Sequence, residues 1–200
     1  MSGLLPAALM AELRRRYGEP QRHYHTWAHI EALLRLFEDV RGDLSDPAAV
    51  EAALYYHDAV YDPRASDNEA RSAALLRADC AEVLSADSLA AAAGLIEATA
   101  GHRLPPDLAA PAQADAALFL DMDLSILAAP WPDFLAYEAA IRREYAHVEE
   151  AAFRAGRGAF LENLMNREKL YFSSYFGECF EVPARANLRR SLKVLRRPAR

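Results

Sequence analysis

The chain has 200 residues, of which 52% are hydrophobic and 26% are charged, and its formal net charge is −6. This length and composition predict one soluble domain with enough material for a core, with two lobes as the alternative, and no apolar run reaches the roughly 20 residues of a membrane span. The acidic balance argues against a nucleic-acid polymer as partner, since phosphate backbones require clustered cations.

The sequence shows no sign of export. Its N-terminus lacks a basic start, a long apolar stretch and a small-residue cleavage site, so we expect no secretion signal. The two cysteines, Cys80 and Cys179, form no CxxC motif, which favours the cytoplasm over an oxidising compartment.

Positive charge is concentrated at the C-terminal end. Residues 184–200 carry seven Arg or Lys and no acid, which leaves a formal charge of −13 on the rest of the chain. We expect this segment to be the solvated face of a last helix, where cations suit the helix dipole, with a small docking patch as the alternative.

Nearly every segment has the pattern of a helix. Alanine and leucine abound, β-branched residues are sparse, and no window alternates apolar and polar residues with period two. No internal repeat is present, so the sequence predicts a single all-α domain. In chain order we expect helices over residues 4–17, 24–40, 47–57, 68–84, 87–101, 112–128, 133–146 and 149–165, and a last helix after Pro183.

Two histidines stand four residues apart in the segment YHTWAHI. On the helix expected over 24–40, this spacing places His25 and His29 on one face, about 40° apart around the axis. That face continues through Leu33 and Leu36, so it points into the core. A buried imidazole needs a partner, and two on one inward face favour a functional site over ordinary core histidines.

Further candidate ligands follow along the chain. His57 and Asp58 are adjacent at the end of a helix, so both reach one ion only from the side or end of a turn. Asp121 and Asp123 are two apart and face nearly opposite directions on a helix. Asp123 shares its face with bulkier residues, so we expect it to be the deeper carboxylate and the ligand; the reverse assignment stays open. One divalent metal ion would satisfy all of these groups.

The order His, His-Asp, Asp on helical segments resembles the HD-domain superfamily of metal-dependent phosphohydrolases, and local strings resemble a group of small bacterial members. These strings run from about residue 19 to 188 and are EPQRHYHTWAHI, YYHDAVYDPRASDNEARSA, ATAGH, LFLDMDLSIL, IRREY, GRGAFL and EVPARANL. YHTWAHI also resembles the YHNxxH element of cyclic-nucleotide phosphodiesterases, with Thr26 in the Asn place. The resemblance implies a helical bundle of the HD-domain type, whereas the lack of a GYP-type motif argues against the cyclic-di-GMP subclass.

The resemblance also implies roles for individual residues. The implied metal ligands are His29, His57, Asp58 and Asp123. Asp58 thereby belongs to the catalytic centre, in which His25 would be the general acid. His102, in ATAGH, lies where many HD proteins place a histidine that contacts a second metal or the phosphate. Imidazole and carboxylate ligands suit Mn, Fe, Co, Ni or Zn, and Mg also stays a candidate.

The expected substrate is a small phosphorylated molecule, either a phosphomonoester or a phosphodiester, with nucleotides included. A metal-activated water would attack phosphorus, and nearby cations would neutralise the phosphate. The candidate substrate-binding cations are Arg22, Arg71 and Arg103, with Arg64 beside them, and each could instead be a surface arginine. Tyr55, Tyr56, Tyr61 and Trp27 flank the ligands as candidates for base stacking or as core.

Two other functions stay open at this stage. A di-iron oxygenase would need more histidine ligands than can be assigned here. A non-catalytic helical module that binds a nucleotide or a partner would keep the ion for stability alone. The sequence makes no prediction about the oligomeric state.

Overall fold

The computed structural model describes residues 3–196, and these residues form helices and no strand. The predicted all-α class is therefore confirmed. The α-helices are α1 (Ala7–Tyr17), α2 (Trp27–Val40), α3 (Pro47–Tyr56), α4 (Asn68–Asp79), α5 (Ala86–Ala98), α6 (Ala110–Asp123), α7 (Trp131–Glu144), α8 (Glu150–Met165) and α9 (Ser174–Leu195), and the 3-10 helices are η1 (Arg41–Asp43) and η2 (Leu124–Ala128). Across this part of the chain, no helix combines the length and the apolar character that crossing a membrane requires.

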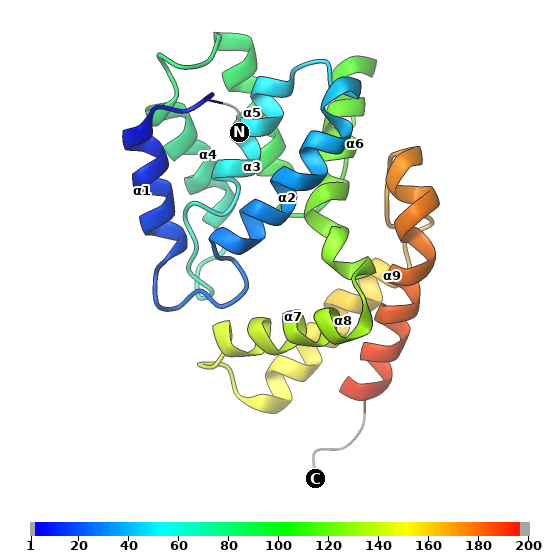
Figure 1. The fold of residues 1–200 in the computed structure, drawn as a ribbon. Coiled ribbons are helices and arrows are strands. Elements are labelled where there is room, and N and C mark those ends of the chain that lie inside the picture. Colours follow the sequence, from blue (N-terminus) through cyan, green and yellow to red (C-terminus); the bar gives the residue numbers. More distant parts are fainter. Residues whose placement is uncertain (1–2, 197–200) are drawn as a thin grey trace. The chain divides into compact units, whose positions relative to one another are not determined.

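The chain divides into two compact units, a first that ends at Met122 and a second that begins at Asp123. The first contains α1 to α5 and nearly all of α6, and the second contains η2 and α7 to α9 (Figure 1). Asp123 is the last residue of α6, so it directly continues a helix of the first unit. The single HD-type domain stays a prediction.

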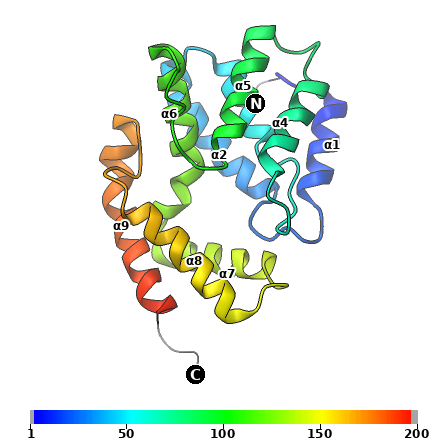
Figure 2. The same cartoon turned by 180° about the vertical axis from the view of Figure 1, so that it is seen from behind.

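Helix α3 is the central helix of the first unit, because every residue from Ala49 to Tyr56 is buried. It packs against α2, α4 and α5, and α4 also packs against α5 (Figure 2). Its start follows the sequence signals: Asp46 accepts a hydrogen bond from the Ala49 N–H at 3.0 Å, and Pro47 fills the first helical position. The C-terminal end of this buried helix carries the His-Asp pair.

A buried carboxylate joins α6 to the start of α3. Asp115 accepts hydrogen bonds from the backbone N–H groups of Ser45 at 2.9 Å and Asp46 at 2.8 Å. Eight successive residues of α6, from Asp115 onward, are buried, so this helix runs through the interior of its unit. Further along α6, the ring of Phe119 lies edge to face with that of His57, with centroids 6.2 Å apart. Helix α6 therefore reaches the end of α3 that carries the His-Asp pair.

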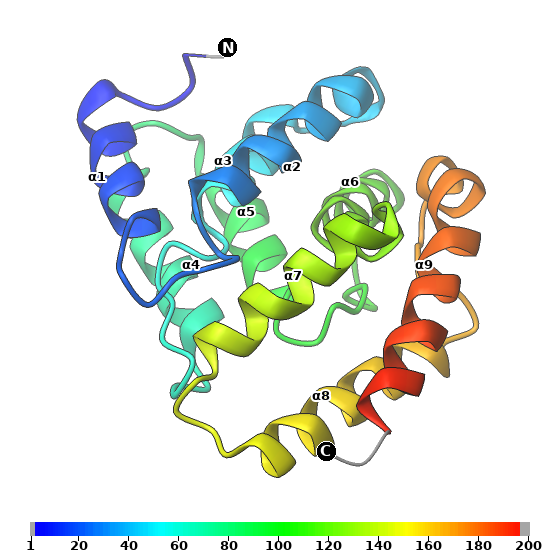
Figure 3. The same ribbon diagram turned by 60° about the horizontal axis from the view of Figure 1, so that its bottom comes forward.

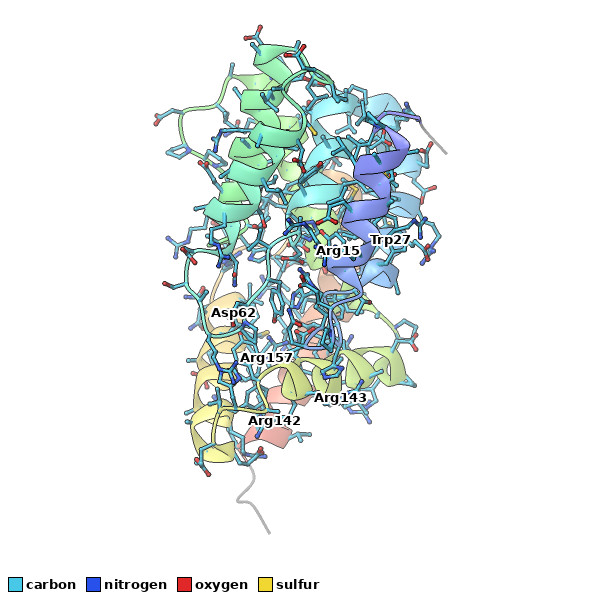
Figure 4. The ribbon with its side chains drawn as sticks, turned by 90° about the vertical axis from the view of Figure 1, so that its left-hand side faces the viewer. Arg15, Trp27, Asp62, Arg142, Arg143 and Arg157 are labelled. Atoms are coloured by element: carbon cyan, nitrogen blue, oxygen red, sulfur yellow. The ribbon has the colours of Figure 1, made fainter. Side chains whose placement is uncertain are left out.

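The second unit has its own core. Helix α9 packs against η2 and α8, and α7 packs against η2 (Figure 3). Arg157 of α8, labelled in Figure 4, donates a hydrogen bond to the Tyr137 hydroxyl at 2.6 Å and forms an ion pair with Glu138. Ser191 of α9 donates to Glu138 at 3.2 Å, so three helices meet at this carboxylate. Burial raises the pKa of Tyr137, which keeps its hydroxyl neutral.

The last helix begins earlier than predicted. We expected it after Pro183, whereas α9 begins at Ser174 and contains Pro183 in its interior. The earlier start has its own cap, because Ser173 accepts a hydrogen bond from the Phe176 N–H at 3.3 Å. The buried ring of Phe176 then packs on Phe180, with centroids 4.9 Å apart. The helix continues through Pro183, although proline cannot donate a backbone hydrogen bond.

The predicted basic face of the last helix is confirmed for the described residues. The exposed cations there are Arg189, Arg190, Lys193 and Arg196. Residues 197–200 of the basic segment lie outside the described part of the chain.

Two internal helix ends also differ from the prediction. Helix α4 ends at Asp79 rather than at residue 84, because Cys80 leaves helical geometry and the following residues form turns. The helix expected over residues 112–128 is α6 followed by η2, with the change to a 3-10 helix directly after Asp123.

Candidate metal centre

The two histidines of YHTWAHI come from different local structures. Helix α2 begins at Trp27, and its N-cap Thr26 has extended backbone (φ −110°, ψ 175°), so His25 precedes the helix. The prediction that both histidines share one helix face is therefore wrong, because the backbone is extended at Thr26 and turns helical only from Trp27. His29 lies in the first turn of α2 and is buried, whereas His25 is half-buried.

His57 is oriented by the last turn of α3. Its Nδ1 lies 3.0 Å from the carbonyl oxygen of Leu54. Because a carbonyl oxygen only accepts hydrogen bonds, Nδ1 is the protonated nitrogen when the ring is neutral, and Nε2 then carries a lone pair. A backbone bond of this kind commonly fixes the tautomer and the ring orientation of a metal-ligating histidine. The sequence shows only that His57 stands three residues after Leu54 at the end of a helix, which does not by itself predict this hydrogen bond.

Two other potential ligand atoms lie close to the Nε2 atom of His57. The Nε2 atom of His29 lies 3.2 Å from it, and Oδ2 of Asp58 lies 3.0 Å from it. The same Oδ2 lies 3.9 Å from Nε2 of His29. Both imidazoles are buried and Asp58 is half-buried, so these nitrogen and carboxylate atoms at the end of α3 are largely shielded from solvent.

Asp123 completes a group that can hold a metal ion. One ligand atom each of His29, His57 and Asp123 lies within 4.8 Å of the other two. Asp123 stands one helical turn after Phe119 on α6, which explains how its carboxylate reaches the end of α3. Three of the four predicted ligands thus form this group, and the fourth, Asp58, contacts its two histidines.

The burial predicted for the two aspartates of α6 is wrong. Asp121 is fully buried, whereas Asp123 is only partly so. The prediction compared the bulk of neighbouring side chains on two helix faces. Helix α6 is buried on all sides over residues 115–122, so both faces exclude water and bulk does not separate them. Asp123 is nevertheless the aspartate that joins the histidine group.

The spacing of the donors fits a metal ion. An ion held at about 2.0–2.1 Å from imidazole nitrogen places neighbouring ligand atoms roughly 2.9–3.4 Å apart. The separations of 3.2 Å between the two Nε2 atoms and 3.0 Å between His57 and Asp58 lie in this range, whereas the 3.9 Å between Asp58 and His29 is longer. Two imidazoles and carboxylates suit first-row transition metals such as Mn, Fe, Co, Ni or Zn. The residues therefore fit a divalent ion.

His25 lies at the edge of this group. Its Nε2 atom is 4.0 Å from Oδ2 of Asp58, the oxygen that also faces His29 and His57. The ring of Tyr61 lies against that of His25, with centroids 4.3 Å apart and planes 33° from parallel. Tyr61, considered above as a base-stacking residue, thus packs on a histidine of the site.

Arg22 does not have the surroundings of a substrate-binding residue. Its side chain is fully buried, and its guanidinium donates to the carbonyl oxygens of His25, Asp58 and Ala59. It also forms an ion pair with Glu19 at 3.2 Å. Since these groups occupy its donors, we no longer assign Arg22 to the phosphate.

The loop after α3 is ordered by its own side chains. The N–H of Asp62, labelled in Figure 4, donates to Oδ1 of Asn68 at 3.0 Å, and Nδ2 of Asn68 donates back to the Asp62 carbonyl at 2.9 Å. Asp62 Oδ1 accepts from the Arg64 N–H at 2.9 Å. Glu69 stands in the first turn of α4, where a carboxylate favours the helix dipole.

The remaining predicted site residues lie outside the group defined by His29, His57 and Asp123. His102 follows α5 with a left-handed φ of 45°, and its side chain is half-buried. Arg103 is exposed, and so is Arg71, which lies 3.8 Å from Asp67. Contacts of these three residues with a phosphate stay predictions.

Three aromatic residues near the ligands, Trp27, Tyr55 and Tyr56, pack or bond with other parts of the protein. Trp27, labelled in Figure 4, stacks on Tyr55 with centroids 6.0 Å apart. Tyr56 is fully buried, and its hydroxyl donates to Asp79 at 3.2 Å. These contacts account for the three rings without a base.

Comparison with family models, with curated proteins and with solved structures gives no match. The described residues therefore show helices and a histidine and aspartate group that can hold a metal ion, without a match to a known family.

Proposed function

We propose that this chain is a metal-dependent phosphohydrolase of the HD-domain type, acting on a phosphomonoester or phosphodiester of a small phosphorylated molecule. The observation that carries the proposal is the convergence of His29, His57 and Asp123, with Asp58 Oδ2 3.0 Å from His57 Nε2. Residues far apart in the sequence supply these donors, in the order of the HD resemblance.

Under this proposal, one set of residues would hold a metal ion and His25 would transfer a proton. His29, His57, Asp58 and Asp123 would hold a divalent ion. When bound, such an ion polarises the phosphate and lowers the pKa of a water molecule, which provides a nucleophile near neutral pH. The Leu54 carbonyl keeps the Nε2 lone pair of His57 directed at the ligand group.

His25 is the candidate general acid. It stands beside the ligand group without belonging to it, and the Tyr61 ring restrains its orientation. From this position Nε2 would protonate the oxygen of the leaving group, a contribution of typically about 10²–10⁴-fold. The exposed Arg71 and Arg103 are the candidate cations for the phosphate oxygens.

Metal analysis and a substrate screen test the proposal. Protein purified without chelator is analysed for bound metal, then assayed with Mn, Ni or Mg against aryl phosphomonoesters, aryl phosphodiesters and cyclic nucleotides. We expect bound transition metal and turnover of at least one substrate. In His25→Ala, turnover falls while metal content persists; His23→Ala, an exposed neighbour, is the matched control.

Other outcomes point to other functions. Bound metal without turnover of any substrate favours a non-catalytic binding module. Two irons per chain with oxygen consumption favour an oxygenase. A chain that binds no metal contradicts the proposal altogether.

A further inference from the structure

Arg22 connects two segments that carry residues of the candidate site. It lies between α1 and α2, and its side chain is fully buried. Its Nη1 donates to the Asp58 carbonyl at 2.7 Å and to the His25 carbonyl at 3.2 Å, and its Nη2 donates to the Ala59 carbonyl at 3.1 Å. One guanidinium thus holds the backbones of both His25 and Asp58.

The guanidinium is itself fixed in place. Its Nε donates to Glu19 at 3.2 Å, and its plane lies over the rings of Tyr17 and Tyr61, 5.0 Å and 5.4 Å from their centroids. Arginine presents five donors in a rigid planar fork, whereas lysine presents a single point charge on a flexible stem. Only an arginine can donate hydrogen bonds to these carbonyls and to Glu19 at the same time.

The ligands differ in how much they depend on this clamp. His29 is held within α2, and His57 is held by α3 and by its bond to Leu54. Asp58 lies in the turn after α3, where helix-end carbonyls lack intrahelical partners. Arg22 supplies the partners for the Asp58 and Ala59 carbonyls. Its loss would therefore leave buried acceptors unpaired and free the Asp58 backbone to move.

We propose that Arg22 is a positioning residue of the metal centre, which sets the Asp58 carboxylate and His25 against the two ligand histidines without contacting metal or substrate. This inference rests on the proposed metal site. It predicts that removing the clamp weakens metal binding by about 10–100-fold, the usual effect of losing a group that orients a ligand.

Cobalt binding to the full chain tests this inference. Wild type, Arg22→Met and Arg22→Lys are titrated with Co²⁺, and affinity is measured by calorimetry and the ligand geometry by the visible d–d spectrum. Arg77→Met is the matched control, because it removes an exposed guanidinium paired with Glu97 at 2.9 Å, away from the site. Far-UV circular dichroism in chelator establishes that each variant is folded.

We expect both Arg22 variants to lose affinity and to show an altered spectrum, and Arg77→Met to match wild type. In a third variant, Arg22→Ala, which leaves space for the missing group, added guanidinium at millimolar concentration should restore part of the affinity and the original spectrum. If Arg22→Met does not fold, the Co²⁺ affinity of Arg22→Lys and the guanidinium rescue test the inference instead. Folded Arg22 variants with wild-type affinity and spectrum overturn the inference while leaving the proposed function intact. A wild type that binds no Co²⁺ overturns both.

Discussion

The Nε2 atoms of His29 and His57 face each other at 3.2 Å inside the first unit. The Leu54 carbonyl directs a lone pair of neutral His57 into the gap between the two rings, where it can accept a hydrogen bond from His29 or bind a cation. The carboxylates of Asp58 and Asp123 lie close enough to share that cation.

Metal should stabilise the folded chain. A ligand that binds only the folded state at about 100 times its dissociation constant adds about 2.7 kcal/mol. For a chain of this size we expect the thermal midpoint to rise by about 5–11 °C with Mn²⁺, Co²⁺, Ni²⁺ or Zn²⁺. Differential scanning fluorimetry with and without chelator measures this shift. The His29→Ala/His57→Ala double variant should show no rise, and an equal rise in that variant would place the metal elsewhere.

The two aspartates of α6 should have separable roles. Asp123→Ala removes a ligand. Losing only a group that orients a ligand lowers metal affinity by about 10–100-fold, so we expect a larger fall in this variant. Asp121 is fully buried, and a buried carboxylate requires partners. Asp121→Ala should therefore lower the free energy of unfolding by about 1–3 kcal/mol and leave metal affinity within a few-fold of wild type. Calorimetry and urea unfolding measure the two effects, and the opposite pattern would make Asp121 the ligand.

The fold class could be predicted from the sequence, because helical periodicity is a local signal. His29, His57 and Asp123 were among the ligands that the HD resemblance implied, whereas the burial argument that preferred Asp123 to Asp121 was wrong. The relative placement of His25 and His29 could not be predicted, since α2 begins at Trp27, two residues after His25. The hydrogen bonds of Arg22 could not be predicted for a similar reason. Its partners are the backbone carbonyls of distant residues, and carbonyl positions leave no trace in side-chain identity.

The two cysteines should differ sharply in reactivity. Cys80 is fully buried and burial raises the pKa of its thiol, so the thiolate that reacts with disulfide reagents is scarce at pH 8. Cys179 is exposed on α9. Ellman's reagent should label one thiol per native chain and two in denaturant. In Cys179→Ser the native count should fall to zero; fast labelling of that variant would mean that α4 opens readily.

Pro183 should be replaceable with a gain in stability. It lies in the interior of α9, where it removes a backbone hydrogen bond and crowds the preceding turn, and its side chain is exposed. Proline costs about 3 kcal/mol relative to alanine in a helix interior, and its restriction of the unfolded chain returns roughly 0.4–1 kcal/mol of that. We therefore expect Pro183→Ala to raise the free energy of unfolding by about 1–3 kcal/mol, measured by urea denaturation. The exposed Ala186→Gly, one turn later, is the matched control and should lower it by about 1 kcal/mol. If Pro183→Ala instead destabilises the protein, the proline fixes a bend that the packing of α9 on η2 and α8 requires.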